Sequence, residues 1–379
     1  MNGTIKGEIF LIKASAPGKL YIAGEYAVLE PGHPALIVAL DQFITVTLKE
    51  ADKQGSICSS YSNGISIPWT RKNGKFFIDE RENPFSYITK SVTLVEQYLQ
   101  ELGFNLKYFD LTIESELDNK DGRKYGLGSS GAVTIATIKA ILTLYKIDYT
   151  SELLYKLAAI THLSLNSNGS FGDLAASSYG GWIAYSCFEK EWVLEELDNK
   201  KNKINDLISK DWPKLRIQPL KAPQDLRLLI GWTGSPASTT LLVDQINDEQ
   251  NEMNGFYKQF LEDSYNCVMW IIDAFNEKDI NKIQQGIRIN RHLLKSLASK
   301  SGVDIETDAL TDLCTIAEEY SGAAKSSGAG GGDCGIVLFN QQAEILPMIT
   351  AWRNKGIVDL PLQVYKEKET DYKPIIWED

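Results

Sequence analysis

The sequence predicts an α+β protein of two domains, each with its own sheet and its own helices. Strand-like segments, in which apolar and polar residues alternate, are interspersed with segments of helical spacing along the 379 residues. This length is sufficient for two domains that each have a full core. The clearest change of composition is a polar, lysine-rich segment over residues 189–221. We therefore expect an N-terminal domain with a mixed sheet over residues 1–221, and a C-terminal domain of helices over an antiparallel sheet in residues 222–379.

Strands and turns are predicted for the start of the chain. Strands are predicted at residues 5–16, where apolar and polar residues alternate loosely, at residues 35–48, and at residues 108–115, where apolar residues occupy alternate positions. The Pro-Gly pair at 17–18 predicts a turn, a second turn is predicted at 32–34, and residues 50–84 have the weak polar pattern of short hairpins. Lys19 follows the first turn directly, and on local pattern alone a lysine there is more often solvated than functional.

Helices are predicted where apolar residues recur three and four positions apart. In the N-terminal half they cover residues 87–102, ending at Gly103, then residues 133–145, and then a segment with Ser151 as its N-cap. In the C-terminal half they cover residues 254–275, 280–297 and 307–320, the last with Thr307 as its cap. Two more strands are expected at residues 226–231 and 336–339.

Composition and charge restrict the class of protein. Apolar residues make up 43% of the chain and charged residues 23%, as in an ordinary soluble globular protein. The net charge of −11 argues against nucleic acid or an anionic membrane as the main partner. The five cysteines form no C-x-x-C pair, and with three histidines neither a disulfide framework nor a zinc site is supported. No stretch approaches the ~18 apolar residues of a membrane span, so we expect a reducing cytoplasm.

The segment at 124–133 is the strongest functional signal in the chain. Three glycines and two serines fall within residues 126–131, directly before a predicted helix. A glycine-rich turn at a helix N-terminus presents unpaired backbone N–H groups and the positive end of the helix dipole, which together suit phosphate. We therefore expect this loop to bind phosphate, with a flexible Gly/Ser turn as the alternative.

Two other kinds of phosphate loop can be distinguished from this one. Residues 126–131 fit the dinucleotide pattern G-x-G-x-x-G, and Asp148 stands near the place of a ribose-binding acid. However, the charged segment 116–123 separates the loop from the preceding strand, and the helix after it leads to another helix instead of a strand. A Walker loop requires Gly-Lys-Ser/Thr, whereas Gly131 is followed by Ala132.

Two further segments carry candidate site residues. Asp173 is a single acid among small residues, so it either caps the next turn or directs a carboxylate into a cavity, and local pattern slightly favours the cap. Residues 325–335 contain five glycines between a predicted helix and a predicted strand. This is either a helix stop with a loose turn or a backbone that approaches a ligand closely.

Together these segments resemble one family. Residues 17–29, 126–132 and 325–335 are similar to the three motifs of the GHMP small-molecule kinases, the relatives of galactokinase, homoserine kinase, mevalonate kinase and phosphomevalonate kinase. The order and spacing of the motifs fit over nearly the whole chain. Within the family, residues 18–31 and the segment G-W-T-G-S-P-A-S-T at 231–239 are most similar to the bacterial phosphomevalonate kinases.

The resemblance implies a fold, a reaction and ligands. The fold would be a ribosomal-protein-S5-like N-terminal domain and a ferredoxin-like α/β C-terminal domain, with the active site in the cleft between them. The reaction would transfer the γ-phosphoryl group of ATP to the small-molecule substrate 5-phosphomevalonate with the help of Mg²⁺, in a monomer or a homodimer. The alternatives are another GHMP kinase, such as a mevalonate kinase, and a non-catalytic relative that binds nucleotide or metabolite.

The resemblance also implies the site residues. Lys19 would bridge the donor and acceptor phosphates, and Asp173 would hold Lys19 and the acceptor in place, since a nearby carboxylate keeps an ammonium group protonated. The expected ATP-binding residues are Gly126, Leu127, Gly128, Ser129, Ser130, Gly131 and Ala132, with Ser130 also at the metal. The expected substrate-binding residues are Lys124, Ser170, Ser238, Thr239, Arg291, Ser327, Gly328 and Gly330. Arg291 is equally compatible with a solvated helix face.

One departure from the family pattern concerns the metal. Mevalonate kinases carry a metal-binding Glu eleven residues before the catalytic Asp, and His162 occupies that position here. The departure argues against a mevalonate kinase and leaves the Mg²⁺ ligands beyond Ser130 undefined.

Overall fold

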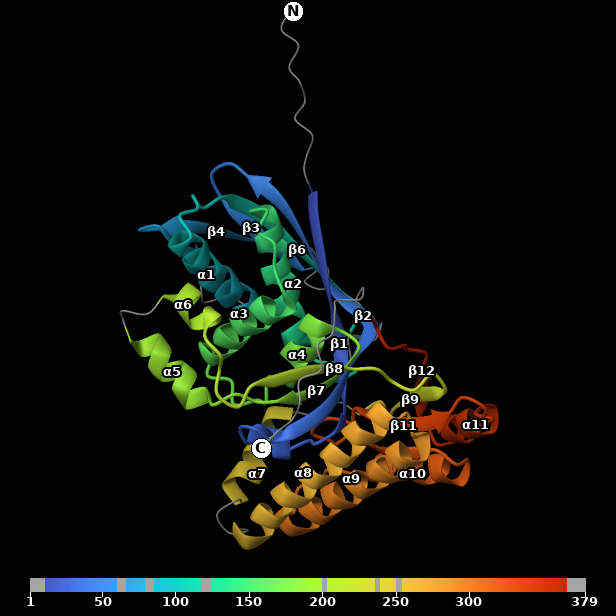
Figure 1. Cartoon of the computed structure of the whole chain (residues 1–379). Helices are drawn as coiled ribbons and strands as arrows, with labels where there is room; N and C mark the ends of the chain where they lie inside the picture. Colours follow the sequence, from blue (N-terminus) through green and yellow to red (C-terminus); the bar gives the residue numbers. More distant parts are fainter. Residues whose placement is uncertain are drawn as a thin grey trace, which may run out of the picture.

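The computed structural model describes residues 11–59, 66–78, 85–117, 125–199, 203–235, 239–249 and 254–366. It contains two β-sheets with helices packed against them (Figure 1), which confirms the α+β class. The first sheet and its helices comprise β1 (Leu11–Ala23), η1 (Ala27–Leu29), β2 (Pro34–Ala51), β3 (Gly55–Ser59), β4 (Ser66–Lys72), β5 (Lys75–Ile78), α1 (Ser86–Glu101), β6 (Tyr108–Ser115), α2 (Ser129–Leu144), α3 (Ser151–Leu163), α4 (Gly172–Tyr179), β7 (Trp182–Ser186), α5 (Lys190–Asp198), α6 (Ile204–Ser209) and β8 (Arg216–Leu220). The second sheet and its helices comprise β9 (Leu226–Trp232), α7 (Thr239–Glu249), α8 (Asn254–Glu277), α9 (Ile280–Ser301), α10 (Asp308–Glu319), β10 (Ala323–Ser326), β11 (Cys334–Asn340), α11 (Leu346–Asn354) and β12 (Val358–Leu360).

The first sheet is mixed, as the sequence predicts. Its strand order within the described residues is β5-β4-β3-β6-β2-β7-β8, and β1 pairs with β2 outside this path. Only the β3–β6 pair among these is parallel. The long strand β2 pairs with β1, β6 and β7, and α2 packs against β1 and β2. Because α2 is apolar on nearly all sides, it is buried between the sheet and the helices α1 and α3.

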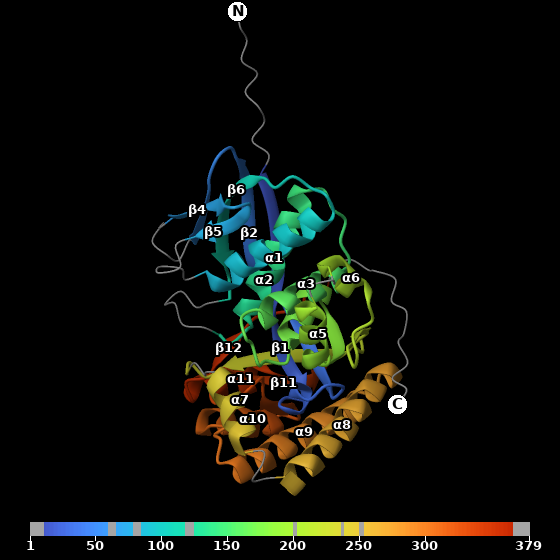
Figure 2. The ribbon, with the colours of Figure 1, turned by 90° about the vertical axis from the view of Figure 1, so that its left-hand side faces the viewer.

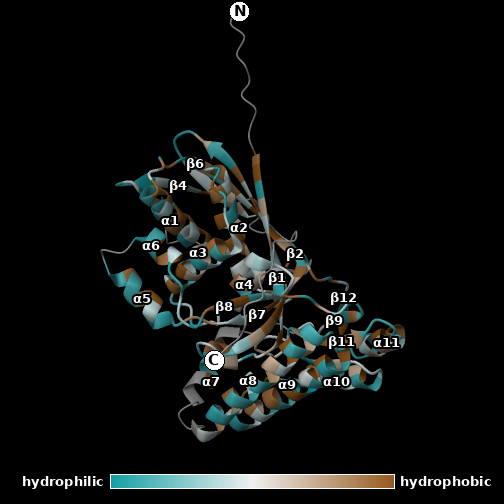
Figure 3. Cartoon of the chain, viewed as in Figure 1, coloured by the Kyte–Doolittle hydropathy of each residue, from teal (hydrophilic) through white to brown (hydrophobic). Residues whose placement is uncertain are grey.

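The second sheet is antiparallel, with the order β10-β11-β9-β12. The helices α8 and α9 lie side by side (Figure 2), and α9 and α10 contact β10 and β11. Hydrophilic and hydrophobic residues alternate along α8 and α9 (Figure 3), as expected for helices with one face on a core. Among the described residues, no helix is both long and apolar enough to cross a bilayer.

One hydrophobic core cluster extends across both sheets. One cluster of buried residues joins Val38 of β2 to Ile271 of α8 and Ile336 of β11. The ring centroids of Trp182 in β7 and Phe275 in α8 lie 5.3 Å apart within this cluster. The chain passes from the first sheet to the second between β8 and β9, and a domain boundary near residue 222 stays a prediction.

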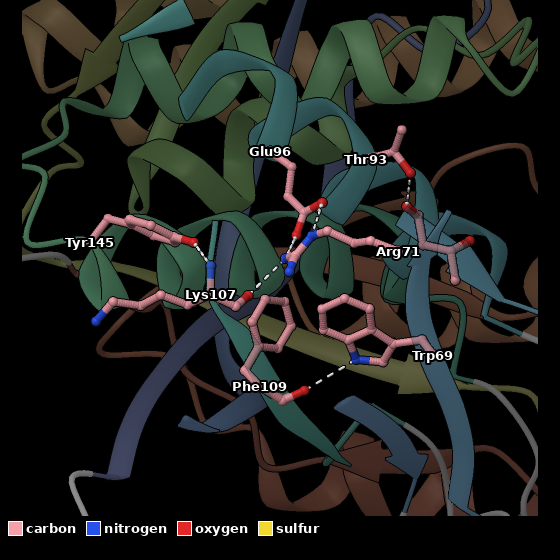
Figure 4. A network of polar contacts seen from close by, with 8 residues as sticks. Trp69, Arg71, Thr93, Glu96, Lys107, Phe109 and Tyr145 are labelled. Carbon is pink, nitrogen blue, oxygen red and sulfur yellow. Dashed lines mark hydrogen bonds and ion pairs between the residues drawn. The ribbon is translucent and has the colours of Figure 1, made fainter. Parts of the chain in front are cut away.

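A polar network (Figure 4) holds together the end of the first sheet with β3, β4 and β6, which lies away from the second sheet in Figure 1. Arg71 of β4 forms an ion pair with Glu96 of α1, and it also donates to the carbonyl oxygen of Lys107 at 2.7 Å. The backbone N–H of Lys107 donates to the Tyr145 hydroxyl at 2.6 Å, and Trp69 Nε1 donates to the Phe109 carbonyl oxygen at 3.1 Å. These contacts fasten β4, α1, β6 and the end of α2 to one another.

Two predicted boundaries at the site differ from the structure. The turn at 17–18 does not form: β1 continues to Ala23, and its pairing with β2 shifts in register between Pro17 and Gly18. A proline has no N–H to donate, and a bulge accommodates it within a strand. Residues 325–335 connect two strands, because Lys325 and Ser326 belong to β10, which the sequence analysis did not predict.

Two smaller differences concern helix starts. The helix α2 begins at Ser129, inside the glycine-rich loop, instead of at residue 133. The N-cap of α3 is Thr150 instead of Ser151, because the Thr150 hydroxyl accepts the Leu153 N–H at 3.1 Å.

Candidate active site

A cavity of about 510 Å³ lies where β1, the start of α2, the start of α4 and the loop after β10 meet. Lys19, Tyr21 and Glu25 contribute to it from the first half of the chain, and Gly328, Ala329 and Asp333 from the second. The other residues that line it are Tyr26, Val28, Leu29, Tyr87, Gly126, Gly128, Ser129, Ser130, His162, Ser167, Asn168, Gly169, Ser170, Phe171, Asp173 and Val243. The three segments singled out in the sequence therefore converge on one cleft between the two sheets.

Lys19 lies on β1 and lines the cavity. Its backbone N–H donates to the Leu127 carbonyl oxygen at 2.8 Å, and its Nζ donates to the Gly126 carbonyl oxygen at 3.3 Å. Burial lowers the pKa of the Lys19 ammonium group from its ordinary value, and the carboxylates of Asp173 and Asp333 oppose this shift. The residue is therefore a partly desolvated cation among carboxylates, and not a solvated turn lysine.

Asp173 lies in the first turn of α4 and lines the same cavity. The N-cap of α4 is Phe171, and no side chain makes the capping hydrogen bond. Ser130 Oγ lies 3.5 Å from Asp173 Oδ2, at the outer limit of a hydrogen bond. The cap interpretation of Asp173 was therefore wrong, and its carboxylate borders the cavity.

The glycines of the loop leave room for these charged side chains. A Cβ on Gly128 would lie 2.9 Å from Lys19 Cε, and one on Gly131 would lie 2.7 Å from Asp173 Oδ2. A Cβ on Gly126 would lie 2.5 Å from Asp333 Oδ2. Besides leaving backbone free for phosphate, the glycines thus allow the loop to lie against one cation and two carboxylates.

Tyr87 and His162 complete this end of the cavity, although local sequence did not mark Tyr87. Thr134 Oγ1 donates to the Ser130 carbonyl oxygen at 2.8 Å, so its contact of 3.1 Å with His162 Nε2 places a hydrogen on that nitrogen. Burial lowers the pKa of His162, and Asp173 opposes the shift. The centroid of the His162 ring lies 4.7 Å from that of the Tyr87 ring, and the two ring planes are tilted by 41°. An imidazole with a lowered pKa therefore stands at the position for which the mevalonate kinase pattern described above has a Glu.

Glu25 and Lys325 form a buried ion pair that the sequence analysis did not identify. Lys325 is fully buried and Glu25 is 3% exposed. The Lys325 ammonium also donates to the Ser326 carbonyl oxygen at 2.6 Å, and the neighbouring Tyr26 hydroxyl donates to the Ala329 carbonyl oxygen at 2.5 Å. The first and third motifs are thus fastened together directly beside the cavity.

The expected substrate residues are only partly brought together. Ser170 and Gly328 line the cavity. Ser327 is buried and donates to the Tyr21 carbonyl oxygen at 2.8 Å, whereas a Cβ on Gly330 would lie 2.1 Å from the Ile305 carbonyl oxygen. Neither lines the cavity in the described part of the chain, so both support the loop instead.

The Arg291 side chain binds Glu306 instead of lining the cavity. Its guanidinium group donates to both carboxylate oxygens of Glu306, at 2.8 and 2.7 Å, and it does not line the cavity. We therefore leave Arg291 out of the site. Lys124 and Ser238 lie outside the described residues, as does the side chain of Thr239.

The remaining expected loop residues either pack beneath the loop or line the cavity. Leu127 is 2% exposed, Ala132 is fully buried, and Gly131 is buried against Asp173. Ser129 and Ser130, at the N-terminus of α2, line the cavity.

Comparison with known proteins agrees with this geometry. Residues 86–181 match the GHMP kinases N terminal domain, and residues 271–358 match the GHMP kinases C terminal domain. The chain is 36% identical over 359 residues to a phosphomevalonate kinase of a Streptomyces species, covering 92% of this chain and 95% of that protein. It is 26% identical over 370 residues to a mevalonate kinase of Thermococcus sibiricus, covering 91% of this chain and 97% of that protein.

Solved structures also show similarity to a phosphomevalonate kinase. The Streptococcus pneumoniae phosphomevalonate kinase in complex with phosphomevalonate and AMPPNP has a TM-score of 0.81 at 31% identity, covering 93% of this chain and 99% of that one. The Lin0012 protein of Listeria innocua has a TM-score of 0.86 at 37% identity, covering 94% of this chain and 99% of that one. The chain therefore belongs to the GHMP kinases, a family of ATP-dependent kinases, on the branch of the phosphomevalonate kinases.

Proposed function

We propose that the protein transfers the γ-phosphoryl group of ATP to the phosphate of 5-phosphomevalonate, giving 5-diphosphomevalonate and ADP in the mevalonate route to isopentenyl diphosphate. The observation that carries the proposal is the convergence of Lys19, Asp173 and the N-terminus of α2 on one cavity. The similarity to phosphomevalonate kinases at more than 30% identity supports the choice of acceptor.

The N-terminus of α2 is the proposed site of the ATP phosphates. Its first backbone N–H groups have no partner within the helix, and the hydroxyl groups of Ser129 and Ser130 stand beside them. The part of the cavity lined by Ser170 and Gly328 is the proposed site of the acceptor phosphate. We infer that Lys19, which lines the same cavity, lies between the two phosphates when both are bound.

This arrangement suits transfer between two anions. An oxygen of the acceptor phosphate attacks the γ-phosphorus, and the bond from that phosphorus to the departing ADP oxygen breaks. The second pKa of a phosphate is about 6, so the attacking oxygen needs no strong general base. Repulsion between the anions is the main obstacle, and Lys19 offsets it as charge moves from one side to the other.

Asp173 has an indirect part in this mechanism. Burial lowers the pKa of Lys19 and so disfavours its charged form. Asp173 opposes that shift and also adjoins Ser130. We infer that it keeps Lys19 charged and oriented, and that it does not act as a base.

Mg²⁺ fits the site as an ion carried by ATP. Mg²⁺ commonly keeps several waters and binds through one or two carboxylates together with substrate phosphates. Ser130 and Asp173 are the residues that would hold it, because their oxygens lie 3.5 Å apart beside the proposed phosphate site. When bound, the ion would neutralise charge on the ATP phosphates. The described residues contain no group of three or more potential metal-ligating side chains, which is consistent with an ion held mainly by ATP and water.

Location and assembly complete the proposal. All five cysteines are free thiols, which suits a reducing cytoplasm. A monomer or a homodimer would serve the mechanism, since the cavity is formed within one chain.

An assay of several acceptors tests the proposed function. ATP consumption is measured with phosphomevalonate, mevalonate, galactose and homoserine, and the phosphorylated product is identified by ³¹P NMR. We expect turnover with phosphomevalonate and a product that contains a diphosphate. Turnover on mevalonate alone would identify a mevalonate kinase, and binding of ATP without turnover on any acceptor would identify a regulator.

A further inference from the structure

Three tyrosine hydroxyl groups hold Ser170, which lines the cavity: Tyr155 and Tyr185 form a hydrogen-bonded chain that ends on its backbone, and Tyr21, which also lines the cavity, bonds its side chain. The hydroxyl groups of Tyr155 and Tyr185 lie 2.8 Å apart, and the Tyr185 hydroxyl donates to the Ser170 carbonyl oxygen at 2.5 Å. On the other side of Ser170, the Tyr21 hydroxyl lies 2.5 Å from Ser170 Oγ. Both the backbone and the side chain of Ser170 are therefore held by tyrosines.

The donor of each of these hydrogen bonds can be assigned. A carbonyl oxygen can only accept, so the single hydroxyl hydrogen of Tyr185 is directed to Ser170. Tyr155 must then donate to Tyr185. Both rings are fully buried, and burial raises the pKa of each hydroxyl well above its usual range, so both remain protonated donors.

The segment that this chain holds leads directly to Asp173. Phe171 has a left-handed backbone, with φ 60°, which is unfavourable for a residue with a side chain, and its ring packs 5.1 Å from that of Phe188. A Cβ on Gly172 would lie 2.2 Å from the Tyr21 hydroxyl oxygen. The turn from Ser170 to Asp173 is therefore strained, and surrounding contacts keep it in one conformation.

We propose that Tyr155, Tyr185 and Tyr21 are positioning residues, which act through Ser170 and Asp173 to hold the acceptor beside Lys19. The inference rests on the proposed function, because that function assigns Ser170 to the acceptor. Removal of the Tyr185 hydroxyl leaves the Ser170 carbonyl oxygen and the Tyr155 hydroxyl without their partner while the ring keeps its place. The turn then loses its anchor, and Ser170 and Asp173 shift together.

A purely structural role is the competing explanation, and Tyr145 provides the matched control. Tyr145 is 8% exposed, and its hydroxyl also bonds a backbone group, the Lys107 N–H at 2.6 Å (Figure 4). It lies at the C-terminal end of α2, whereas the cavity adjoins the N-terminal end. Tyr185→Phe and Tyr145→Phe each remove one oxygen and one hydrogen bond to the backbone. Only the first is expected to change catalysis.

The experiment compares kcat, KM for both substrates and Tm in the parent and in Tyr185→Phe, Tyr155→Phe, Tyr21→Phe and Tyr145→Phe. We expect kcat/KM for phosphomevalonate to fall on the order of 10- to 100-fold in Tyr185→Phe, since small misplacements of reacting groups cost this much. The KM for ATP should stay near that of the parent. Tyr155→Phe should lose less, because the bond from Tyr185 to Ser170 remains, and Tyr145→Phe should lower Tm without changing kinetics.

Parent-like kinetics in Tyr185→Phe, or an equal kinetic loss in Tyr145→Phe, would overturn the positioning role. If Tyr185→Phe does not fold, parent-like kinetics in both Tyr155→Phe and Tyr21→Phe would overturn it. If the parent phosphorylates a different acceptor, only the proposed function is contradicted. The kcat/KM values of Tyr185→Phe and Tyr145→Phe on that acceptor, each compared with the parent, then decide the positioning role.

Discussion

Glu25 and Lys325, 300 residues apart in the chain, form an ion pair that is almost completely shielded from solvent. The pair joins the loop after β1 to the strand β10, and so joins the two sheets beside the cavity. Glu25 Oε1 accepts from Lys325, whereas Glu25 Oε2 is buried and has no hydrogen-bond donor within the described residues. A buried charge without its partner is costly, so each of these residues depends on the other.

The first prediction concerns the stability that depends on this pair. Lys325→Met leaves the Glu25 carboxylate buried without its counter-charge and should lower the free energy of unfolding by about 3–5 kcal/mol. The double variant Glu25→Gln/Lys325→Met should regain much of that loss, because both charges are gone. Urea denaturation measures each value.

The control is an exposed ion pair. Lys107 and Glu50 form such a pair at 3.0 Å, with side chains 40% and 54% exposed. Lys107→Met should change the free energy of unfolding by less than about 1 kcal/mol. A double variant no more stable than Lys325→Met would show that the uncompensated charge is not the cause.

The second prediction separates backbone strain from steric overlap in the phosphate loop. Gly128 has φ 78°, and a Cβ there would press on Lys19 Cε at 2.9 Å. Gly103 has φ 85°, but a Cβ there would meet nothing within 4 Å. Gly128→Ala and Gly103→Ala should therefore both lose about 1 kcal/mol of stability through strain. Only Gly128→Ala should lose turnover, because it displaces Lys19, and a fully active Gly128→Ala would refute the role of this contact.

The third prediction concerns alkaline pH. Burial lowers the pKa of Lys19 below its ordinary value of 10.5, so its positive charge is lost as the pH rises through the lowered pKa. We expect kcat/KM of the parent to fall at a pH below that at which an exposed lysine deprotonates. Lys19→Arg, if it retains measurable activity, should lack this fall, because a guanidinium group keeps its charge. A pH profile of both proteins tests this, and the same alkaline fall in Lys19→Arg would assign it to another group.

Much of the fold could be predicted because its elements carry strong local patterns. The strand β6 has the predicted bounds, and α1, α8, α9 and α10 lie within a few residues of theirs, since apolar spacing and end signals agree. The predicted turn at 17–18 failed because pairing with β2, decided by tertiary contacts, carries β1 through the Pro-Gly pair. The strand β10 was missed because four residues carry too little pattern.

The site could be predicted only where its chemistry lies in contiguous residues. The loop at 126–131 was recognisable from its glycines, whereas Lys19 and Asp173 each had a more ordinary local interpretation until three motifs were read together. The pairing of Glu25 with Lys325 and that of Arg291 with Glu306 join distant residues, and neither leaves a signal in local sequence. For Arg291 the sequence left both a substrate role and a solvated helix face open, because nothing in the local pattern shows that the Glu306 carboxylate lies across from it.

The most direct test of the central claim is the steady-state kinetics, on phosphomevalonate, of Lys19→Ala, Asp173→Asn and the double variant. If Lys19 offsets charge between the two phosphates, Lys19→Ala should lower kcat on the order of 10²–10³-fold while the dissociation constant for ATP changes far less. Asp173→Asn keeps the shape of the side chain but removes the charge beside Lys19, and it should also lower kcat. The double variant should be little worse than the poorer single variant, because residues that act as a unit are not additive. Full activity in Lys19→Ala, or losses that multiply in the double variant, would contradict this account.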